Sequence, residues 1–310
     1  MKQKIQMNPS SDRSIEEAYQ LFIKKAKVRN LSEKTIQTYN NHYKIFSEVY
    51  DTSLPLTELT EEVIDNFTLY LREKREIGEV TVNSYLRTMR AFCYYCMECG
   101  YLKKFNIKLL KETRKIKETY TPAELERLLA KPNINSCTFT EFKIWVFENY
   151  LLGTGNRIST ALDVHISDIR FDESAIILRK VKNRKQQIIP LSNALASVLE
   201  EYLEIRGGAE EDYLFCNIYG EHGNVRTFQD LIKKYNEKRN VEKSSAHLFR
   251  HTFAKNWILA GGDIFRLQKI LGHSDLTVTK QYVQMFGQDL QMDFEKFNPL
   301  DRMKKNKIEM

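Results

Sequence analysis

The sequence predicts a mainly helical protein with a small β-sheet, arranged in two domains. Three observations support this fold class. The chain has 310 residues, more than one domain of average size contains. Apolar residues recur at helical spacing from residue 12 to about residue 105. In the second half of the chain, "SAIILRKVKNRKQQIIPLS" interrupts the helical pattern with isoleucines on both sides of a polar tip, as in a β-hairpin.

The first domain, residues 12–105, is predicted to be a bundle of four amphipathic helices. In "SIEEAYQLFIKKAKVR", Ile15, Ala18 and Phe22 share one face at a period of 3.6 residues. The preceding Ser14 is suited to cap this helix, because its hydroxyl can accept a hydrogen bond from a free amide of the first turn. The next three helices are expected to begin at Ser32, Thr60 and Thr81.

The composition indicates a chain that can form hydrophobic cores and that has no membrane-spanning segment. It is 42% hydrophobic and 29% charged, and it contains no apolar run long enough to cross a bilayer. The polar residues after Met1 do not resemble a signal peptide, so a cytoplasmic location is expected. The net charge of +7 and the isoelectric point near 8.9 suit a polyanionic partner, although many basic proteins bind none.

Three of the five cysteines lie close together in "CYYCMEC". A structural zinc site needs four ligands, and no histidine or second cysteine pair lies nearby in the sequence to complete one. On a helix, Cys93, Cys96 and Cys99 would follow one apolar stripe. We therefore expect buried core thiols rather than a metal site, and no disulfide framework.

A basic linker is predicted at residues 106–119. Between Lys103 and Lys117 only Glu112 opposes the positive charges. Such a run is usually a solvated surface, but a protein that wraps a DNA duplex would also need one between its domains. Both interpretations stay open. The candidate DNA contacts here are Lys103, Lys104, Lys108, Lys111, Arg114, Lys115 and Lys117.

The second domain, residues 120–287, is predicted to be mostly helical. Thr121 and Glu124 enclose Pro122 in the pattern of a helix start. Strands are expected on both sides of the polar hairpin tip, at residues 176–178 and 188–189, and again at residues 212–217.

Four stretches of this domain carry unusual chemistry: "GTGNRIST", "KVKNRKQQIIP", "SSAHLFRHTFA" and "LGHSDLTVTKQYV". Taken singly, each has an ordinary explanation: an ion-pair partner, a solvated hairpin tip, an exposed pair on a helix, or a helix cap. Their candidate reactive residues are Arg157, Lys182, His247, Arg250, His273 and Tyr282. The hairpin adds Lys180, Arg184 and Lys185 as further candidate DNA contacts.

Together these residues form a complete set for phosphodiester chemistry without a metal. Guanidinium groups bind phosphate oxygens bidentately and stabilise charge in the transition state. A tyrosine nucleophile has an ordinary pKa of about 10, so its ionisation near pH 7 costs roughly 4 kcal/mol, which arginine-bound phosphate and a neighbouring base can offset. A lysine can supply the proton that the leaving deoxyribose oxygen needs.

On these four stretches, and over nearly its whole length, the chain resembles the tyrosine recombinase (phage integrase) family. The resemblance implies a helical core-DNA-binding (SAM-like) domain and a catalytic domain that form a C-shaped clamp on DNA. It also implies that Arg157 and Arg250 bind the scissile phosphate and that His273 bonds a phosphate oxygen. His247 would assist as general base or phosphate contact. Tyr282 would form a 3′-phosphotyrosyl bond, with no need for a metal, ATP or another cofactor.

Lys182 would be the general acid, because it lies eight residues before Pro190, as in the family's hairpin. Lys180 and Lys185 stay rivals, since hairpin lengths vary. Two positions depart from the family pattern: Thr160 replaces the usual acidic residue, and Asn156 replaces the usual leucine. The missing acid would otherwise support the site from outside, so the local structure around Arg157 is expected to differ from the family's. No group that performs chemistry is lost, so an active enzyme is expected.

The resemblance implies a site-specific recombinase (an integrase, resolvase or Xer-like enzyme) acting on a mobile element or replicon through a Holliday junction. Its partners would be double-stranded DNA with a specific recombination site and three further copies of the chain, a dimer on each site. Accessory DNA-bending or directionality proteins are compatible with this, and no membrane is involved. In the tail, residues 288–310, an apolar stripe of Leu290, Phe294 and Phe297 could dock on a neighbouring subunit or on its own domain.

Three rival classes stay in view. A non-catalytic DNA-binding protein of this fold would form no covalent adduct. A type IB topoisomerase would relax supercoils without sequence choice. A metal-dependent nuclease would need an acidic cluster, which the motif region lacks.

Overall fold

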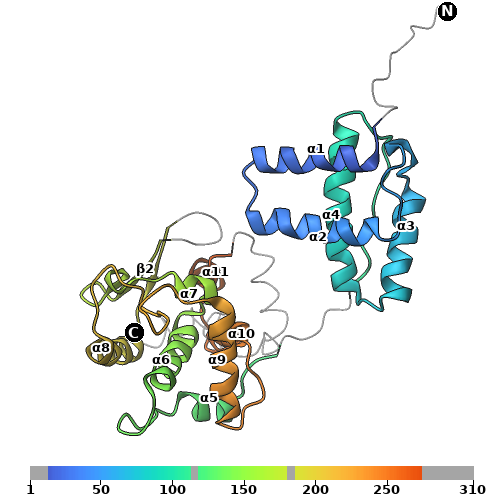
Figure 1. Ribbon diagram of the computed structural model, residues 1–310. Helices are drawn as coiled ribbons and strands as arrows, with labels where there is room; N and C mark the ends of the chain where they lie inside the picture. Colours follow the sequence, from blue (N-terminus) through green and yellow to red (C-terminus); the bar gives the residue numbers. More distant parts are fainter. Residues whose placement is uncertain (1–12, 113–117, 180–185, 274–310) are drawn as a thin grey trace, which may run out of the picture. The chain divides into compact units, whose positions relative to one another are not determined.

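The computed structural model describes residues 13–112, 118–179 and 186–273, and the chain divides into two compact units, Met1–Lys115 and Ile116–Met310 (Figure 1). The described residues are mostly helical with one three-stranded sheet, which confirms the predicted fold class. Each unit has its own hydrophobic core.

The first unit is the predicted helical bundle. Its elements are α1 (Ile15–Val28), α2 (Glu33–Ser47), a 3-10 turn η1 (Leu56–Glu58), α3 (Glu61–Leu69) continued by a π-helical turn η2 (Tyr70–Lys74), and α4 (Glu79–Glu98). Ser14 caps α1 in a reciprocal capping box with Glu17, and Ser32 caps α2, as predicted. The core gathers stacked and edge-on aromatic rings, among them Tyr19, Tyr43 and Phe92.

Helix α4 begins two residues earlier than predicted. It starts at Glu79 rather than Thr81, and the carbonyl of its N-cap Gly78 accepts the amides of Thr81 and Val82 at 2.9 and 3.0 Å. Two of the cysteines on this helix, Cys93 and Cys96, are buried in the core, as predicted. Cys99 is exposed because it stands at the C-cap, where the helix ends, so the predicted stripe of three buried thiols is wrong at its last member.

The beginning of the predicted basic linker packs on the first unit. Ile107 is buried in the bundle core. The Asn83 amide of α4 bonds both backbone groups of Leu110, donating to its carbonyl at 2.9 Å and accepting its N–H at 2.8 Å. Glu112 accepts from the same Asn83 amide and from Arg87. The chain therefore follows α4 as far as residue 112, while the side chains of Lys103, Lys104, Lys108 and Lys111 are exposed.

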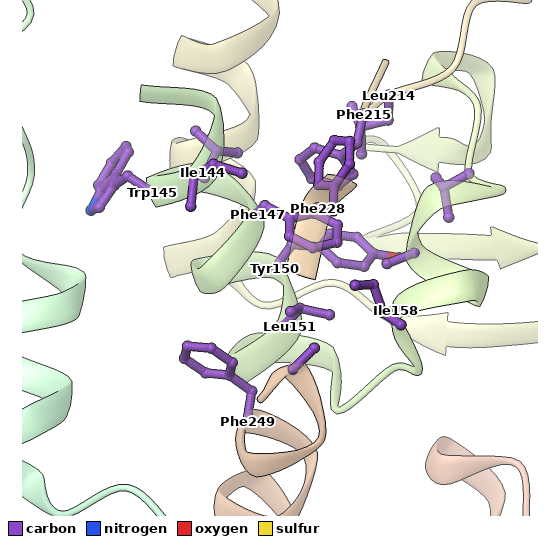
Figure 2. Packing of buried hydrophobic residues seen from close by; sticks show 14 of the residues in the cluster. Ile144, Trp145, Phe147, Tyr150, Leu151, Ile158, Leu214, Phe215, Phe228 and Phe249 are labelled. Carbon is purple, nitrogen blue, oxygen red and sulfur yellow. The ribbon is translucent and has the colours of Figure 1, made fainter. Parts of the chain in front are cut away.

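The second unit is built around α6 (Phe139–Thr154), which packs against α5 (Pro122–Leu129), α8 (Asn193–Arg206), α9 (Val225–Glu237) and α10 (Ala246–Leu259). Figure 2 shows the apolar side chains that α6 sends to its neighbours, with Phe147 and Tyr150 meeting Phe215 and Phe228. A helix that is apolar around most of its circumference belongs in the centre of a domain. Two shorter helices complete the unit: α7 (Ile158–Leu162), which packs on α6 and α9, and α11 (Ile264–Leu271), which packs on α10.

The sheet holds β1 (Ile169–Arg170), β2 (Ala175–Leu178) and β3 (Gln187–Pro190) in that order, all antiparallel. Strands β2 and β3 are the two legs of the predicted hairpin, with Ile176 opposite Ile189. Strand β1, which follows the 3-10 turn η3 (Ile166–Asp168), was not predicted. The strand predicted at residues 212–217 is wrong: Leu214 and Phe215 are buried, but the segment pairs only through isolated bridges, Tyr213 with His165 and Cys216 with His222.

Candidate active site

Arg157 is presented by a tight turn between α6 and α7. Gly155 ends α6 in the left-handed conformation, with φ of +63°, and Arg157 follows as the N-cap of α7 with a partly exposed side chain. A β-carbon on Gly155 would lie 2.7 Å from Phe253 Cδ1 and 2.8 Å from Leu271 Cδ2. Both the backbone conformation and the close packing therefore require glycine two residues before Arg157.

The two positions that depart from the family pattern are both buried. The Asn156 amide donates to the hydroxyl of Tyr150 at 3.0 Å, and both side chains lie inside the domain. Burial raises the pKa of Tyr150 above its ordinary value, so this phenol is a neutral hydrogen-bonding partner. Thr160 is 9% exposed on the inner face of α7. Asn156 therefore has a buried hydrogen-bond partner beside Arg157.

Arg250 is the most buried of the described candidates, with an exposed fraction of 4%. It stands in the second turn of α10. Its Nη1 donates to the carbonyl of Gly155 at 2.9 Å, and its Nη2 donates to the carbonyl of Leu271 at 2.8 Å. One guanidinium therefore joins the turn that precedes Arg157 to the end of α11, the helix that precedes His273.

His273 completes this cluster. Its Nε2 lies 2.6 Å from Nη2 of Arg250, and its side chain is partly exposed. The chain reaches His273 through Gly272, which ends α11 in the left-handed conformation with φ of +61°. The His273 amide then donates back to the carbonyl of Gln268 at 3.1 Å, the pattern of a Schellman cap.

His247 lies one helical turn before Arg250 in the first turn of α10, and its side chain is exposed. Its amide donates to the hydroxyl of the N-cap Ser245 at 3.3 Å, and its ring lies 6.5 Å from that of His251. The His-x-x-Arg motif therefore combines an exposed imidazole with a buried guanidinium. The explanation of this motif as an ordinary exposed pair is wrong for its arginine.

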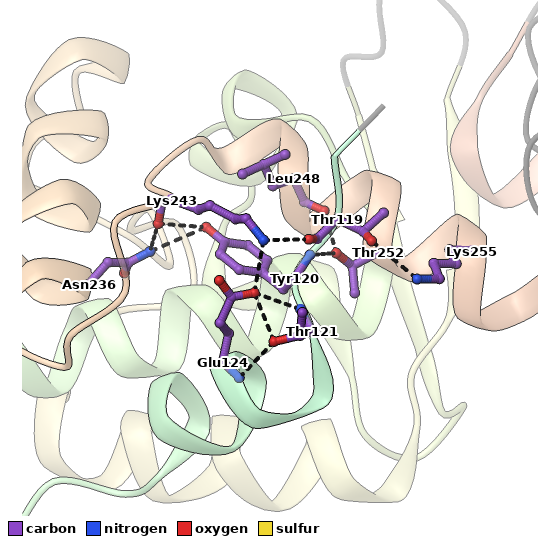
Figure 3. Close-up of polar contacts among 9 residues, drawn as sticks. All are labelled: Thr119, Tyr120, Thr121, Glu124, Asn236, Lys243, Leu248, Thr252 and Lys255. Atoms are coloured by element: carbon purple, nitrogen blue, oxygen red, sulfur yellow. Dashed lines mark hydrogen bonds and ion pairs between the residues drawn. The ribbon is translucent and has the colours of Figure 1, made fainter. Parts of the chain in front are cut away.

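The segment that enters the second unit is fastened to α10 (Figure 3). The Tyr120 amide donates to the hydroxyl of Thr252 at 2.9 Å, at a buried position. Lys243 Nζ donates to the carbonyl of Thr119 at 3.1 Å and to Glu124 at 3.0 Å. Glu124 also closes the predicted capping box of α5. The segment before α5 thus contacts α10, the helix that carries the His-x-x-Arg motif.

Both legs of the hairpin are anchored just outside its polar tip. On the leg from β2, Arg179 donates to the buried carboxylate of Asp168 at 2.6 Å and to the Ser167 hydroxyl at 3.0 Å. On the returning leg, the Gln187 amide donates to the backbone carbonyls of Lys269 and Ile270. These anchors were not predicted from the sequence, because neither the ion pair of Arg179 with Asp168 nor Gln187 belongs to a recognisable sequence motif.

Among the predicted site residues, the structure brings Arg250 and His273 into contact and links them to the turn before Arg157. The predicted Lys182 and Tyr282 lie outside the described residues. So do Lys180, Arg184, Lys185, Arg114, Lys115 and Lys117. Within residues 13–112, 118–179 and 186–273, no cluster of three or more histidine, cysteine or acidic side chains could hold a metal ion, and no helix is long and apolar enough to cross a membrane.

Two family models match the chain and together cover nearly all of it. The model of the phage integrase family matches residues 118–288, and that of the phage integrase SAM-like domain matches residues 15–117. A tyrosine recombinase of Pseudothermotoga lettingae is 26% identical over 283 residues, which are 89% of this chain and 94% of that protein. Tyrosine recombinase XerD of Listeria innocua is 25% identical over 284 residues, 87% of this chain and 94% of that protein.

Solved structures with the same fold include two integrases. The Tn1549 transposon integrase, in complex with a circular intermediate DNA, superposes with a TM-score of 0.71 at 24% identity, covering 86% of this chain and 94% of that one. A lambda integrase dimer bound to a COC′ core site superposes with a TM-score of 0.69 at 15% identity, covering 86% of this chain and 97% of that one.

Proposed function

Because the chain belongs to the phage integrase family, we propose that Arg157, His247, Arg250 and His273 form its active site together with Lys182 and Tyr282. The chain is a tyrosine recombinase, an enzyme that cuts and rejoins DNA through a tyrosine in site-specific recombination. The observation that carries the assignment of residues is the position of Arg250, whose buried side chain reaches the Gly155 turn, the end of α11 and His273 at once.

In the proposed reaction, the Tyr282 hydroxyl attacks the scissile phosphorus and the bond from phosphorus to the 5′ oxygen breaks. The products are a 3′-phosphotyrosyl bond and a 5′ hydroxyl. Arg157, Arg250 and His273 bind the phosphate oxygens and stabilise the additional negative charge of the transition state. His247 is exposed at the start of α10, where it can accept the tyrosine proton or contact the phosphate.

Lys182 donates the proton that the departing 5′ oxygen takes up. Rejoining is the reverse step, in which the 5′ hydroxyl of a second strand displaces the tyrosine. Since the phosphotyrosyl bond conserves the energy of the phosphodiester, no step consumes ATP. Exchange of both strand pairs passes through a Holliday junction and requires four protomers on two duplexes. A lambda integrase tetramer has been solved on such a junction.

Affinity for DNA is proposed to come mainly from contacts of exposed basic side chains with phosphates. The four described candidates in the first unit are Lys103, Lys104, Lys108 and Lys111. Each phosphate that is neutralised on duplex DNA adds about 0.9 to the slope of log affinity against log salt. A role in moving or resolving a mobile element is proposed from the likeness to the Tn1549 transposon integrase.

Covalent capture on randomly nicked genomic DNA from the source cells tests both the activity and the nucleophile. Nicks near the cleavage position release the downstream fragment and trap the enzyme on its target. We expect adducts that survive SDS and form in EDTA, attached to fragments sharing one short sequence. Tyr282→Phe should form none, whereas replacement of the exposed Tyr219 by phenylalanine should leave adduct formation intact.

The other outcomes separate the rival classes. An adduct with Tyr282→Phe would disprove the proposed nucleophile. Adducts spread over fragments without a common sequence would indicate a topoisomerase. Noncovalent binding without any adduct would indicate a DNA-binding protein that does not cut, and cleavage abolished by EDTA would indicate a metal-dependent nuclease.

A further inference from the structure

The last turn of α11 is held by donors from three separate parts of the second unit. The last carbonyls of a helix have no partner within the helix and must be satisfied from elsewhere. Here the Gln268 carbonyl accepts the His273 amide, and the Leu271 carbonyl accepts Arg250. The two carbonyls between them, of Lys269 and Ile270, accept the side-chain amide of Gln187.

Gln187 reaches these carbonyls from strand β3, 82 residues away from Lys269 in the sequence. Its backbone is fixed by the sheet, where it pairs with Leu178. Its side chain is partly buried and lies directly against Gly272: a β-carbon there would come 2.9 Å from Gln187 Oε1. The left-handed turn that leads to His273 is therefore covered by Gln187 as well as bonded through its neighbours.

Gln187 and Arg250 donate to the adjacent carbonyls of Ile270 and Leu271 in one helical turn. Loss of one of these bonds is therefore expected to shift the short backbone segment that carries the other. If the Gln187 bonds were lost, the Ile270 carbonyl would have to find water, and the Lys269 carbonyl would keep only the Gly272 amide, which it accepts at 2.9 Å. The turn could then fray at its end. Leu271, whose carbonyl fixes Arg250, and His273 both lie in that end. We propose that Gln187 is a positioning residue that keeps His273 and Arg250 in register for the phosphate.

This inference rests on the proposed function, in which His273 and Arg250 bind the scissile phosphate. The role proposed for Gln187 also predicts how its loss depends on the leaving group. A residue that orients the phosphate-binding pair affects the transition state whatever atom departs. A change at Gln187 should therefore slow cleavage of an oxygen and of a sulfur leaving group alike, whereas loss of the general acid should be rescued by sulfur, because a thiolate needs no proton.

Amide hydrogen exchange tests the contact without any DNA. In Gln187→Leu, which keeps a side chain of similar bulk but has no donor, the amides of Gly272 and His273 should exchange at least about tenfold faster. Gln187→Arg should restore slow exchange, since a guanidinium can donate to the same carbonyls and suits a helix C-terminus. Gln186→Leu, on the exposed neighbouring position of the hairpin, is the matched control and should change nothing.

Cleavage is then measured on the duplex recovered by covalent capture, nicked beside the cleaved bond and made with either a 5′ oxygen or a 5′-bridging sulfur. Gln187→Leu should slow adduct formation about 10- to 100-fold on both substrates, as small misplacements of catalytic groups do, while noncovalent binding of the duplex stays unchanged. Gln187→Arg should recover most of the rate on both.

Each other result overturns the inference. Wild-type cleavage or wild-type amide exchange in Gln187→Leu would show that the contact positions nothing. Rescue of Gln187→Leu by sulfur would place its role on the leaving group rather than on the phosphate. Failure of the proposed function would look different: the wild-type protein would form no adduct, although the amides of Gly272 and His273 would still respond to Gln187→Leu.

Discussion

Nη2 of Arg250 lies 2.6 Å from Nε2 of His273, so a buried guanidinium and an imidazole are in direct contact. A guanidinium can only donate hydrogen bonds. In this contact the imidazole nitrogen is therefore the acceptor. Because the same Nη2 also donates to the Leu271 carbonyl, the backbone at the end of α11 fixes the position of the arginine that the histidine contacts.

Replacement of Arg250 by lysine keeps the charge but loses the planar fork that reaches both carbonyls and His273. We expect the free energy of unfolding of the second unit to fall by about 1–3 kcal/mol, from the buried hydrogen bonds that are lost. Adduct formation should fall at least about 100-fold, because the same side chain stabilises the transition state. Chemical unfolding and covalent capture measure the two effects.

Arg206→Lys is the matched control for this variant. Arg206 is also largely buried, and it also donates to two backbone carbonyls, those of Gly207 and Tyr213. It should therefore lower stability to a similar extent while leaving adduct formation at the wild-type rate per folded molecule. Full activity in Arg250→Lys would contradict its role in the active site.

Lys182→Ala should slow cleavage of the ordinary 5′-oxygen substrate by about 100-fold or more, the usual contribution of a general acid. With a 5′-bridging sulfur the rate should largely recover. Lys180→Ala and Lys185→Ala are made in parallel, since both are rivals for the same role. If sulfur rescued one of these and not Lys182→Ala, the general acid would be reassigned to that lysine.

Gly155→Ala should destabilise the second unit in two ways. The left-handed backbone costs an alanine about 1–2 kcal/mol. The new β-carbon would also press on Phe253 and Leu271, which adds about 1–3 kcal/mol of overpacking. Because Gly155 supplies the carbonyl that Arg250 binds, adduct formation should fall as well.

Gly220→Ala separates the two costs. Gly220 also has a positive φ, +81°, but no atom lies within 4 Å of the place its β-carbon would take. Unfolding of both variants by urea should show a clearly smaller loss for Gly220→Ala, with no loss of adduct formation. Equal losses would mean that the close packing behind the Arg157 turn is unimportant.

Glu148 on α6 should make the stability of the second unit depend on pH. Its carboxyl is fully buried, and neither oxygen has a hydrogen-bond partner in the part of the chain that the structure describes. Burial raises its pKa well above the ordinary value of 4.5. Between the ordinary pKa of 4.5 and the raised folded-state pKa, the unfolded chain has lost a proton that the folded chain keeps. The free energy of unfolding should therefore decrease as pH rises through this range.

Glu148→Gln removes this titration while keeping the shape of the side chain. Relative to the wild type, the variant should gain stability steadily as pH rises from about 5 to 8. Urea unfolding at several pH values measures the difference. Glu173→Gln, at an exposed position in the turn before β2, should follow the wild-type curve. A constant difference between Glu148→Gln and the wild type would contradict the raised pKa.

Much of the fold could be predicted because its signals are local. Ser14 with Glu17 and Thr121 with Glu124 cap helices through residues three positions apart, so each sequence window contains the whole interaction. Local signals also misled at two places. Gly78 is the N-cap of α4 although it has no side chain to accept a capping hydrogen bond, and residues 212–217 have the apolar character of a strand but pair only through isolated bridges.

The sequence by itself determined the two-domain helical class, the residue types of the reactive set and their order along the chain, since periodicity, caps and motifs depend on near neighbours. Only the tertiary structure decided which candidates meet. Arg250 joins a carbonyl 95 residues before it to a histidine 23 residues after it, and Gln187 reaches a helix end 82 residues away. Such contacts arise from the packing of α6, α10, α11 and β3, and no local pattern encodes them, because a buried donor takes whichever carbonyl the fold brings to it.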